Sequence, residues 1–242
     1  MGDVEGADRV GERGVVRRLR EWKHTALLAT LIAGSVLEPL AVSVSAETQI
    51  VGGVITGLIF IVVLLAVFER RWERRLALTL ITCALAASII HQILPLRSQA
   101  GAIAYHCLAG LFLCFAVAVI LQRIFTRETI RTDDVIGVLC GYLLTAATWG
   151  NLYALVYVIH PTSFRIADAI AGRLGNWHWH RFLFDYFSIA TLTTLGFDDI
   201  APADSPVYSL MWIEAVFGQF YIAVVVAQLV GLRLAQAMKR ER

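Results

Sequence analysis

Residues 191–200 read TLTTLGFDDI, and this stretch gathers oxygen atoms in a chain that is otherwise strongly apolar. Three threonines lead to one glycine, Gly196, and two adjacent carboxylates, Asp198 and Asp199, follow shortly after it. Hydroxyl, carbonyl and carboxylate oxygens are the ligands that hard cations prefer. The stretch is therefore a candidate cation-binding segment, and its function depends on where the surrounding elements place it.

The composition of the chain predicts an integral membrane protein. Of its 242 residues 58% are hydrophobic and only 17% are charged, a mixture that is not typical of a soluble domain. A helix needs about 20 apolar residues to cross a hydrocarbon core of about 30 Å, and lipid offers its backbone no hydrogen bonds. We predict six transmembrane helices, at residues 25–45, 50–68, 76–94, 101–121, 135–159 and 207–231.

The basic residues indicate the topology. Under the six-span arrangement 17 of the 21 Lys and Arg residues lie on one side of the membrane, and Arg97, Arg165, Arg173 and Arg181 lie on the other. The positive-inside rule therefore predicts a cell-membrane protein with both termini in the cytoplasm. The net charge of +2 gives no indication of nucleic acid binding, because the basic groups follow the membrane edge. All four cysteines fall inside predicted spans, so we expect them to be buried packing residues.

A short apolar segment separates the last two spans. The residues RFLFDYFSIATLT (181–193) are too few to cross a membrane, so we predict a re-entrant pore helix that ends at the candidate segment. Span, re-entrant helix, irregular hydroxylated strand and span together are the pattern of a pore module. The predicted organisation is a cytoplasmic N-terminal segment at 1–24, a four-helix transmembrane domain at 25–122, a cytoplasmic linker at 123–134, a pore domain at 135–235 and a cytoplasmic tail at 236–242.

The candidate segment resembles the selectivity filter of the tetrameric potassium-channel superfamily, whose core pattern is T-V-G-Y-G-D. Thr194, Leu195, Gly196 and Phe197 stand at the Thr, Val, Gly and Tyr of that pattern, and Asp199 stands at its closing Asp. The resemblance implies a homotetramer whose main-chain carbonyls at these first four positions, with the Thr194 hydroxyl, replace the water around K⁺. No cofactor is expected beyond permeant K⁺, and no nucleophile–base constellation of an enzyme is present in the sequence.

Positions outside the filter extend the resemblance to roughly residues 135–235. Tyr186 and Phe187 stand where the family has aromatic residues that brace the filter. Gly218 follows at the spacing of the hinge glycine in the inner helix. The resemblance therefore implies that Tyr186 and Phe187 support the filter and that Gly218 is a hinge.

Two positions in the last span leave alternatives open. An acid in a membrane helix usually faces a partner or a cavity. Glu214 therefore either braces the back of the filter by accepting hydrogen bonds, which its place before the hinge favours, or lines the pore. The face through Ile222 and through Val225 or Val226 either lines the pore and gates it by dewetting, or packs against lipid and other helices.

Two departures from the family pattern bear on selectivity. Asp198 replaces the second glycine, and Asp enters the left-handed region at modest cost, so we expect the strand geometry to be retained. Four subunits would bring eight carboxylates of Asp198 and Asp199 to the outer mouth, where they concentrate cations and could hold a divalent ion. Ala190 stands where some relatives carry an acid that supports the filter, so Asp199 needs another partner.

These departures keep three functions in consideration. The first is a passive potassium channel, the second a weakly selective or divalent-permeable cation channel, and the third a non-conducting receptor or scaffold with a pore-like fold. The fourth span, at 101–121, has none of the regularly spaced basic residues that voltage sensing requires, so we expect no voltage gating.

Two further sequence features have simpler interpretations. Glu38 and Pro39 interrupt the first span, and we favour a bend of the helix over a functional acid. The residues WHWH (177–180) fall in the predicted outer loop, where aromatic anchoring at the membrane interface is favoured over metal binding or pH sensing.

Overall fold

The computed structural model describes residues 23–42, 48–93, 99–126, 132–172, 174, 176–196 and 198–240. The helices are α2 (Lys23–Val42), α3 (Thr48–Val67), α4 (Arg71–Ile93), α5 (Gln99–Thr126), α6 (Thr132–Ile159), α7 (Asp168–Ala171), α8 (Trp177–Leu192) and α9 (Ser205–Arg240). A short 3-10 helix η1 (Pro161–Ser163) and two strands, β1 (Phe164–Ile166) and β2 (Ile200–Pro202), lie near α8. Nearly all of the predicted N-terminal segment 1–24, together with Phe197, is outside the described residues.

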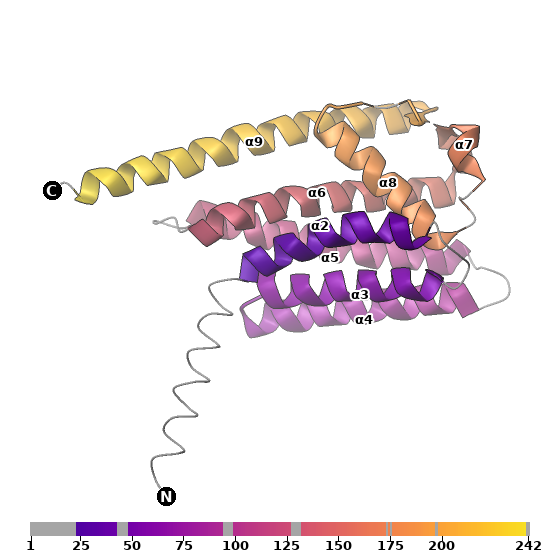
Figure 1. The fold of residues 1–242 in the computed structure, drawn as a ribbon, viewed down its shortest axis with the longest axis horizontal. Coiled ribbons are helices and arrows are strands. Elements are labelled where there is room, and N and C mark those ends of the chain that lie inside the picture. The colour runs from indigo at the N-terminus through magenta and orange to yellow at the C-terminus, as the bar shows by residue number, and fades with distance from the viewer. Residues whose placement is uncertain are drawn as a thin grey trace, which may run out of the picture.

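The long helices run up and down beside one another. Figure 1 shows α3 and α4 on one side of the bundle, α2, α5 and α6 in the middle and α9 on the opposite side. Helix α8 crosses obliquely between α9 and the middle layer (Figure 1). The start of α2 and the end of α9 lie at the same end of the bundle, and α9 extends well past the other helices there (Figure 1).

Four helices in the described part of the chain are long and apolar enough to cross a membrane. They span Arg71–His91, Gln99–Thr126, Asp133–Ile159 and Ser205–Met238. The prediction of a transmembrane span is confirmed for these four segments. Helix α3 contributes a shorter apolar stretch, Val51–Val67, and α2 is not among the four, so their spans stay predictions.

The larger hydrophobic core joins the four N-terminal helices to the predicted pore module. Leu27 of α2, Phe112 of α5 and Leu144 of α6 are fully buried in it, and Val225 of α9 belongs to the same core. Between membrane helices such side chains stabilise the fold through close van der Waals packing, because lipid tails are as apolar as leucine. Helix α5 packs along α6, and α2 packs against both α6 and α8. The first four helices therefore rest on the pore module of their own chain.

The cysteine prediction was wrong at three of the four positions. Cys140 is buried, but Cys83, Cys107 and Cys114 are exposed on the surface of the chain. Each of these spans buries only one face, and a small, weakly polar sulfur is compatible with the other face as well.

The pore helix begins earlier than predicted. Residues 177–180 form the first turn of α8 instead of an outer loop, so the placement of WHWH in a loop was wrong. The side chain of Asn176 caps this turn by accepting hydrogen bonds from the backbone N–H groups of His178 (3.0 Å) and Trp179 (3.3 Å). His178 and His180 are buried. Asn is a typical N-cap residue, so the start of α8 after Asn176 was predictable from the sequence.

Candidate functional site

The backbone of the candidate segment alternates in handedness directly after α8. Thr194 has a φ of 56° and Gly196 a φ of 65°, whereas Leu195 between them does not have a positive φ. Glycine adopts positive φ freely, but a β-branched threonine does so at a cost of about 1–3 kcal/mol, and such strain is concentrated at functional sites. Alternation of this kind turns successive carbonyl groups toward the same side.

The N–H groups of residues 193–196 all donate to carbonyl oxygens in the last turn of α8. The bonds are Thr193 N to Ile189 O (3.0 Å), Thr194 N to Thr191 O (3.0 Å), Leu195 N to Ala190 O (2.8 Å) and Gly196 N to Ala190 O (3.3 Å). No described residue donates a hydrogen bond to the carbonyl oxygens of Thr194, Leu195 or Gly196, and all three residues are exposed. The N–H groups of these residues are bound to α8, and their carbonyl oxygens are left on the exposed side. Such a row of carbonyl oxygens can bind cations.

Two residues of the segment have positive φ, Thr194 and Gly196. Asp198 follows Phe197, which is outside the described residues, so the expectation of left-handed geometry at Asp198 stays a prediction. The chain is already entering β2 here, since the carbonyl oxygen of Asp199 accepts a hydrogen bond from the backbone N–H of Ala167 at 2.9 Å. Both carboxylates are exposed at this exit.

A small sheet holds the exit of the segment. Strands β1 and β2 are antiparallel, with Phe164 opposite Pro202, Arg165 opposite Ala201 and Ile166 opposite Ile200. The sequence analysis did not predict this sheet, because strands of three residues are too short to show an alternating pattern.

The two predicted bracing aromatics have different contacts. Phe187 is buried, and its ring meets Tyr153 edge-on with ring centroids 5.0 Å apart. Tyr186 donates a long hydrogen bond of 3.4 Å from its hydroxyl to Oδ2 of Asp199. Tyr186 is therefore a partner for Asp199 where Ala190 offers none.

Glu214 lies behind the segment and not on its exposed side. Its side chain is fully buried, its Oε2 accepts a hydrogen bond of 2.7 Å from the Tyr153 hydroxyl, and its Oε1 accepts one from Ser188. Ser188 also contacts the carbonyl oxygen of Ala146 at 2.7 Å. These contacts join α9, α6 and α8, and they favour the bracing alternative over the pore-lining one. The sequence analysis did not identify the two hydroxyl partners.

Gly218 allows α9 to touch the end of α8. A Cβ atom at this position would lie 3.0 Å from Cδ1 of Leu192 and would clash with the Leu192 carbonyl oxygen. Helix α9 is continuous through Gly218, so close packing is a reason for this glycine that the hinge prediction did not include. Farther along α9, Ile222 and Val226 are 45% and 48% exposed, whereas Val225 is 2% exposed. Val226 is thus the exposed one of the two alternatives.

An ion pair connects the first helix to the pore helix. Arg181 Nη2 lies 2.6 Å and 2.7 Å from the two carboxylate oxygens of Glu38, and Arg181 Nη1 donates to the Tyr105 hydroxyl at 3.3 Å. Helix α2 continues through Pro39 to Val42, so a bend at Glu38 and Pro39 stays a prediction, and Glu38 has an ion-pair partner in addition. Arg181 lies within α8, one turn after the start of this helix.

The candidate segment and the helices on either side of it match a known protein family. Residues 138–232 match the sequence model of a family described as ion channel, and the match runs from α6 through α8 and the candidate segment into α9. This part of the chain belongs to that ion channel family, which lies within the potassium-channel-like superfamily. The protein is a multi-pass membrane protein that transports ions and is not an enzyme. No curated protein and no solved structure matches the chain.

Proposed function

We propose that the protein is a homotetrameric potassium channel that conducts K⁺ passively and is not gated by voltage. The observation that carries this proposal is the outward row of carbonyl oxygens at Thr194, Leu195 and Gly196, whose N–H groups are bound to α8. Potassium sheds its water only where oxygen ligands replace it. One chain provides one wall of such a site, and four copies around an axis enclose the ion.

The whole chain is proposed to span the membrane six times with both termini in the cytoplasm. Helices α2 and α3 have 20 residues each, which corresponds to about 30 Å of helix. Glu38 would be costly in the α2 span if it were alone, but its bidentate pairing with Arg181 compensates the charge. Lys23 at the start of α2 pairs with Glu69, which supports a charged cytoplasmic end.

The described helices support an absence of voltage gating. In α5 the basic residue of the last turn is Arg123, and it is bound to Glu73 at 2.9 Å. A gating charge has to move through the field across the membrane. An arginine fixed at the end of the helix by an ion pair does not do so.

A specific observation favours a second candidate, the weakly selective or divalent-permeable cation channel. Asp198 stands at the second glycine of the family pattern, and its carboxylate is exposed beside that of Asp199. Exposed carboxylates attract cations through their charge, whereas discrimination between ions requires dehydrated oxygen sites in series. The exposed Asp198 and Asp199 are the proposed site for a divalent cation at the outer mouth.

Reversal potentials in planar bilayers test the proposal and separate the candidates. The purified tetramer should give potentials that follow the K⁺ gradient over Na⁺. Equal Na⁺ and K⁺ permeability would favour the second candidate, and an intact tetramer without flux would favour a non-conducting receptor.

Gly196→Ala is the mutant for this assay. A Cβ atom at Gly196 meets no atom within 4 Å, so the change acts through the φ of 65° alone and should abolish flux without crowding a neighbour. Gly57→Ala is the matched control, because its Cβ also meets nothing within 4 Å and its φ is not left-handed. Unchanged flux in Gly196→Ala would contradict a role for this backbone.

A further inference from the structure

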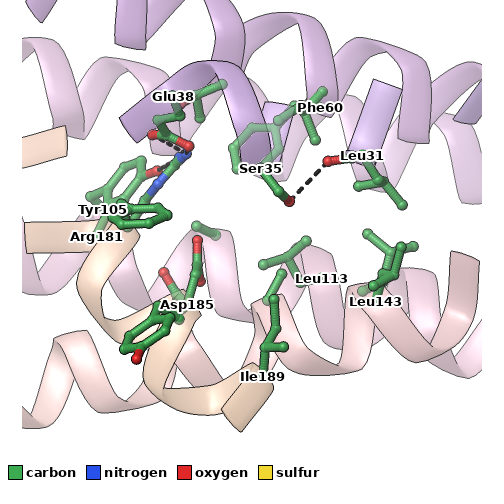
Figure 2. A pocket seen from close by; sticks show the side chains of 18 residues that line it. Leu31, Ser35, Glu38, Phe60, Tyr105, Leu113, Leu143, Arg181, Asp185 and Ile189 are labelled. Carbon is green, nitrogen blue, oxygen red and sulfur yellow. Dashed lines mark hydrogen bonds and ion pairs between the residues drawn. The ribbon is translucent and has the colours of Figure 1, made fainter. Parts of the chain in front are cut away.

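A cavity of about 200 Å³ lies between the first helices and the pore helix, apart from the ion-conducting segment. Five helices contribute to its wall, namely α2, α3, α5, α6 and α8. Figure 2 shows Phe60, Leu113, Leu143 and Ile189 around its apolar part, with the Glu38–Arg181 pair at one end. The cavity therefore has an apolar body and a charged end.

Most polar groups of the cavity wall are already used. Arg181 binds Glu38 and Tyr105, as described above. The remaining bonds are Ser35 Oγ to Leu31 O (2.9 Å), Thr56 Oγ1 to Gly52 O (2.9 Å), and the side chain of Asn151 to the ring (2.9 Å) and carbonyl oxygen (2.6 Å) of His106. A ligand in the cavity would find these groups satisfied except for Arg181 Nε, a buried donor without a hydrogen-bond partner among the described residues.

The carboxylate of Asp185 is the acceptor of the cavity wall that stays available to a ligand. Asp185 lines the cavity, projects from α8 toward it (Figure 2), and receives no hydrogen bond from any residue in the described ranges. Its position is fixed, because a Cβ atom on Gly150 of α6 would lie only 2.8 Å from the Asp185 Cα. With Glu38, Arg181 and Asp185 the charged end carries two carboxylates and one guanidinium. Its formal charge therefore favours a cation.

We propose that this cavity is a binding site for a small organic ammonium ligand, with the ammonium group on Asp185 and an apolar ring among the leucine and phenylalanine side chains. An apolar cavity of about 150 Å³ accommodates benzene, so about 200 Å³ accommodates a six-membered ring with a short aminoalkyl substituent. A primary ammonium donates up to three hydrogen bonds, and a carboxylate is its strongest acceptor. Benzylammonium is the probe that fits both requirements.

The position of the site gives it a consequence for conduction, and this consequence rests on the proposed function. The cavity wall includes Arg181, Asp185 and Ile189, which lie along one side of α8. The carbonyl oxygen of Ile189 also accepts the hydrogen bond from the N–H of Thr193, at the start of the segment after α8. A ligand here contacts the four-helix unit and the filter support at once, so occupancy should change channel conductance.

Calorimetric titration of the purified full-length protein with benzylammonium tests the site without any measurement of ion flux. Binding should occur at one site per chain, and benzyl alcohol, the neutral isostere, should bind at least tenfold more weakly. Asp185→Asn should weaken benzylammonium binding at least tenfold. Ala147→Leu, which fills the apolar wall and keeps every charge, should weaken both ligands.

Each alternative has its own result in this titration. Equal affinity for benzyl alcohol, or full affinity in Asp185→Asn, would overturn the proposal in favour of an apolar space for lipid tails. Asp198→Asn is the matched carboxylate change at the outer mouth and should leave the affinity within twofold. If Asp198→Asn weakens binding while Ala147→Leu does not, the ligand is at the mouth and the cavity site is wrong. A non-conducting protein that binds benzylammonium as described would contradict the proposed function alone.

Discussion

The Glu38–Arg181 pair is the contact between the two parts of the chain whose loss should be easiest to measure. Both side chains are buried, with 6% of the Glu38 and 11% of the Arg181 side chain exposed, and the pairing is bidentate. We predict that Arg181→Met destabilises the protein strongly and that Glu38→Gln in the same chain restores a large part of the loss.

The magnitude follows from the charges that remain. Arg181→Met leaves Glu38 and Asp185 as two carboxylates around one cavity with no cation between them. Removing one partner of a buried pair costs about 3–5 kcal/mol, and replacing both partners is often close to neutral. For a chain of this length 1 kcal/mol corresponds to about 2–4 °C in Tm, so the single variant should melt about 6–20 °C lower. Glu38→Gln alone should cost less, because Arg181 can turn to Asp185 one helical turn away.

The assay is the temperature at which half of the detergent-solubilised protein stays monodisperse. Arg165→Met is the matched control, because Arg165 is exposed on β1 and surface substitutions change stability by about 0.5 kcal/mol or less. Two results would refute this prediction. One is the same melting temperature for Arg181→Met and Arg165→Met. The other is a double variant, Arg181→Met with Glu38→Gln, that melts no higher than Arg181→Met alone.

Three further predictions concern the pore module. Gly218→Ala should lower the apparent Tm, since overpacking against Leu192 costs about 1–3 kcal/mol. Gly231→Ala is the control and should not lower the Tm, because its Cβ meets nothing within 4 Å. Equal Tm values for the two variants would contradict the close contact at Gly218. Glu214→Leu should reduce the tetramer fraction in size-exclusion chromatography, because the buried Tyr153 hydroxyl loses its acceptor and α9 loses its bond to Ser188 of α8. Intact tetramers with low conductance would instead indicate a pore-lining acid. Asp198→Asn should lower single-channel conductance in dilute salt but not at 1 M, where the screening length is about 3 Å, and a deficit that persists at 1 M would argue against an electrostatic role.

Features that depend on local pattern could be predicted from the sequence. Long apolar runs identify the four confirmed spans, because a helix in lipid has to be apolar over its whole length. The ion channel class followed from the resemblance of one ten-residue stretch to the selectivity filter of the potassium-channel superfamily. The positive φ of Gly196 was also predictable, because glycine adopts positive φ freely.

Features that depend on pairing across the chain could not be predicted. Glu38 and Arg181 are 143 positions apart, and no periodicity or motif links them. The partners of Glu214 come from two different helices, so an acid was recognisable as costly but its donors were not. The left-handed Thr194 was missed because a β-branched residue rarely adopts this conformation, and it does so here where hydrogen bonds to α8 hold the backbone.

Helix α9 has 36 residues and no break, which makes it a rod of about 54 Å that touches α8 near Gly218. The part from Gly218 to Arg240 measures about 33 Å at 1.5 Å per residue. A tilt of about 5° at the contact would carry the far tip through about 3 Å, a length comparable to the diameter of a water molecule. The rod therefore amplifies motion, and a small displacement at the contact with α8 becomes a large one at the C-terminal end of α9.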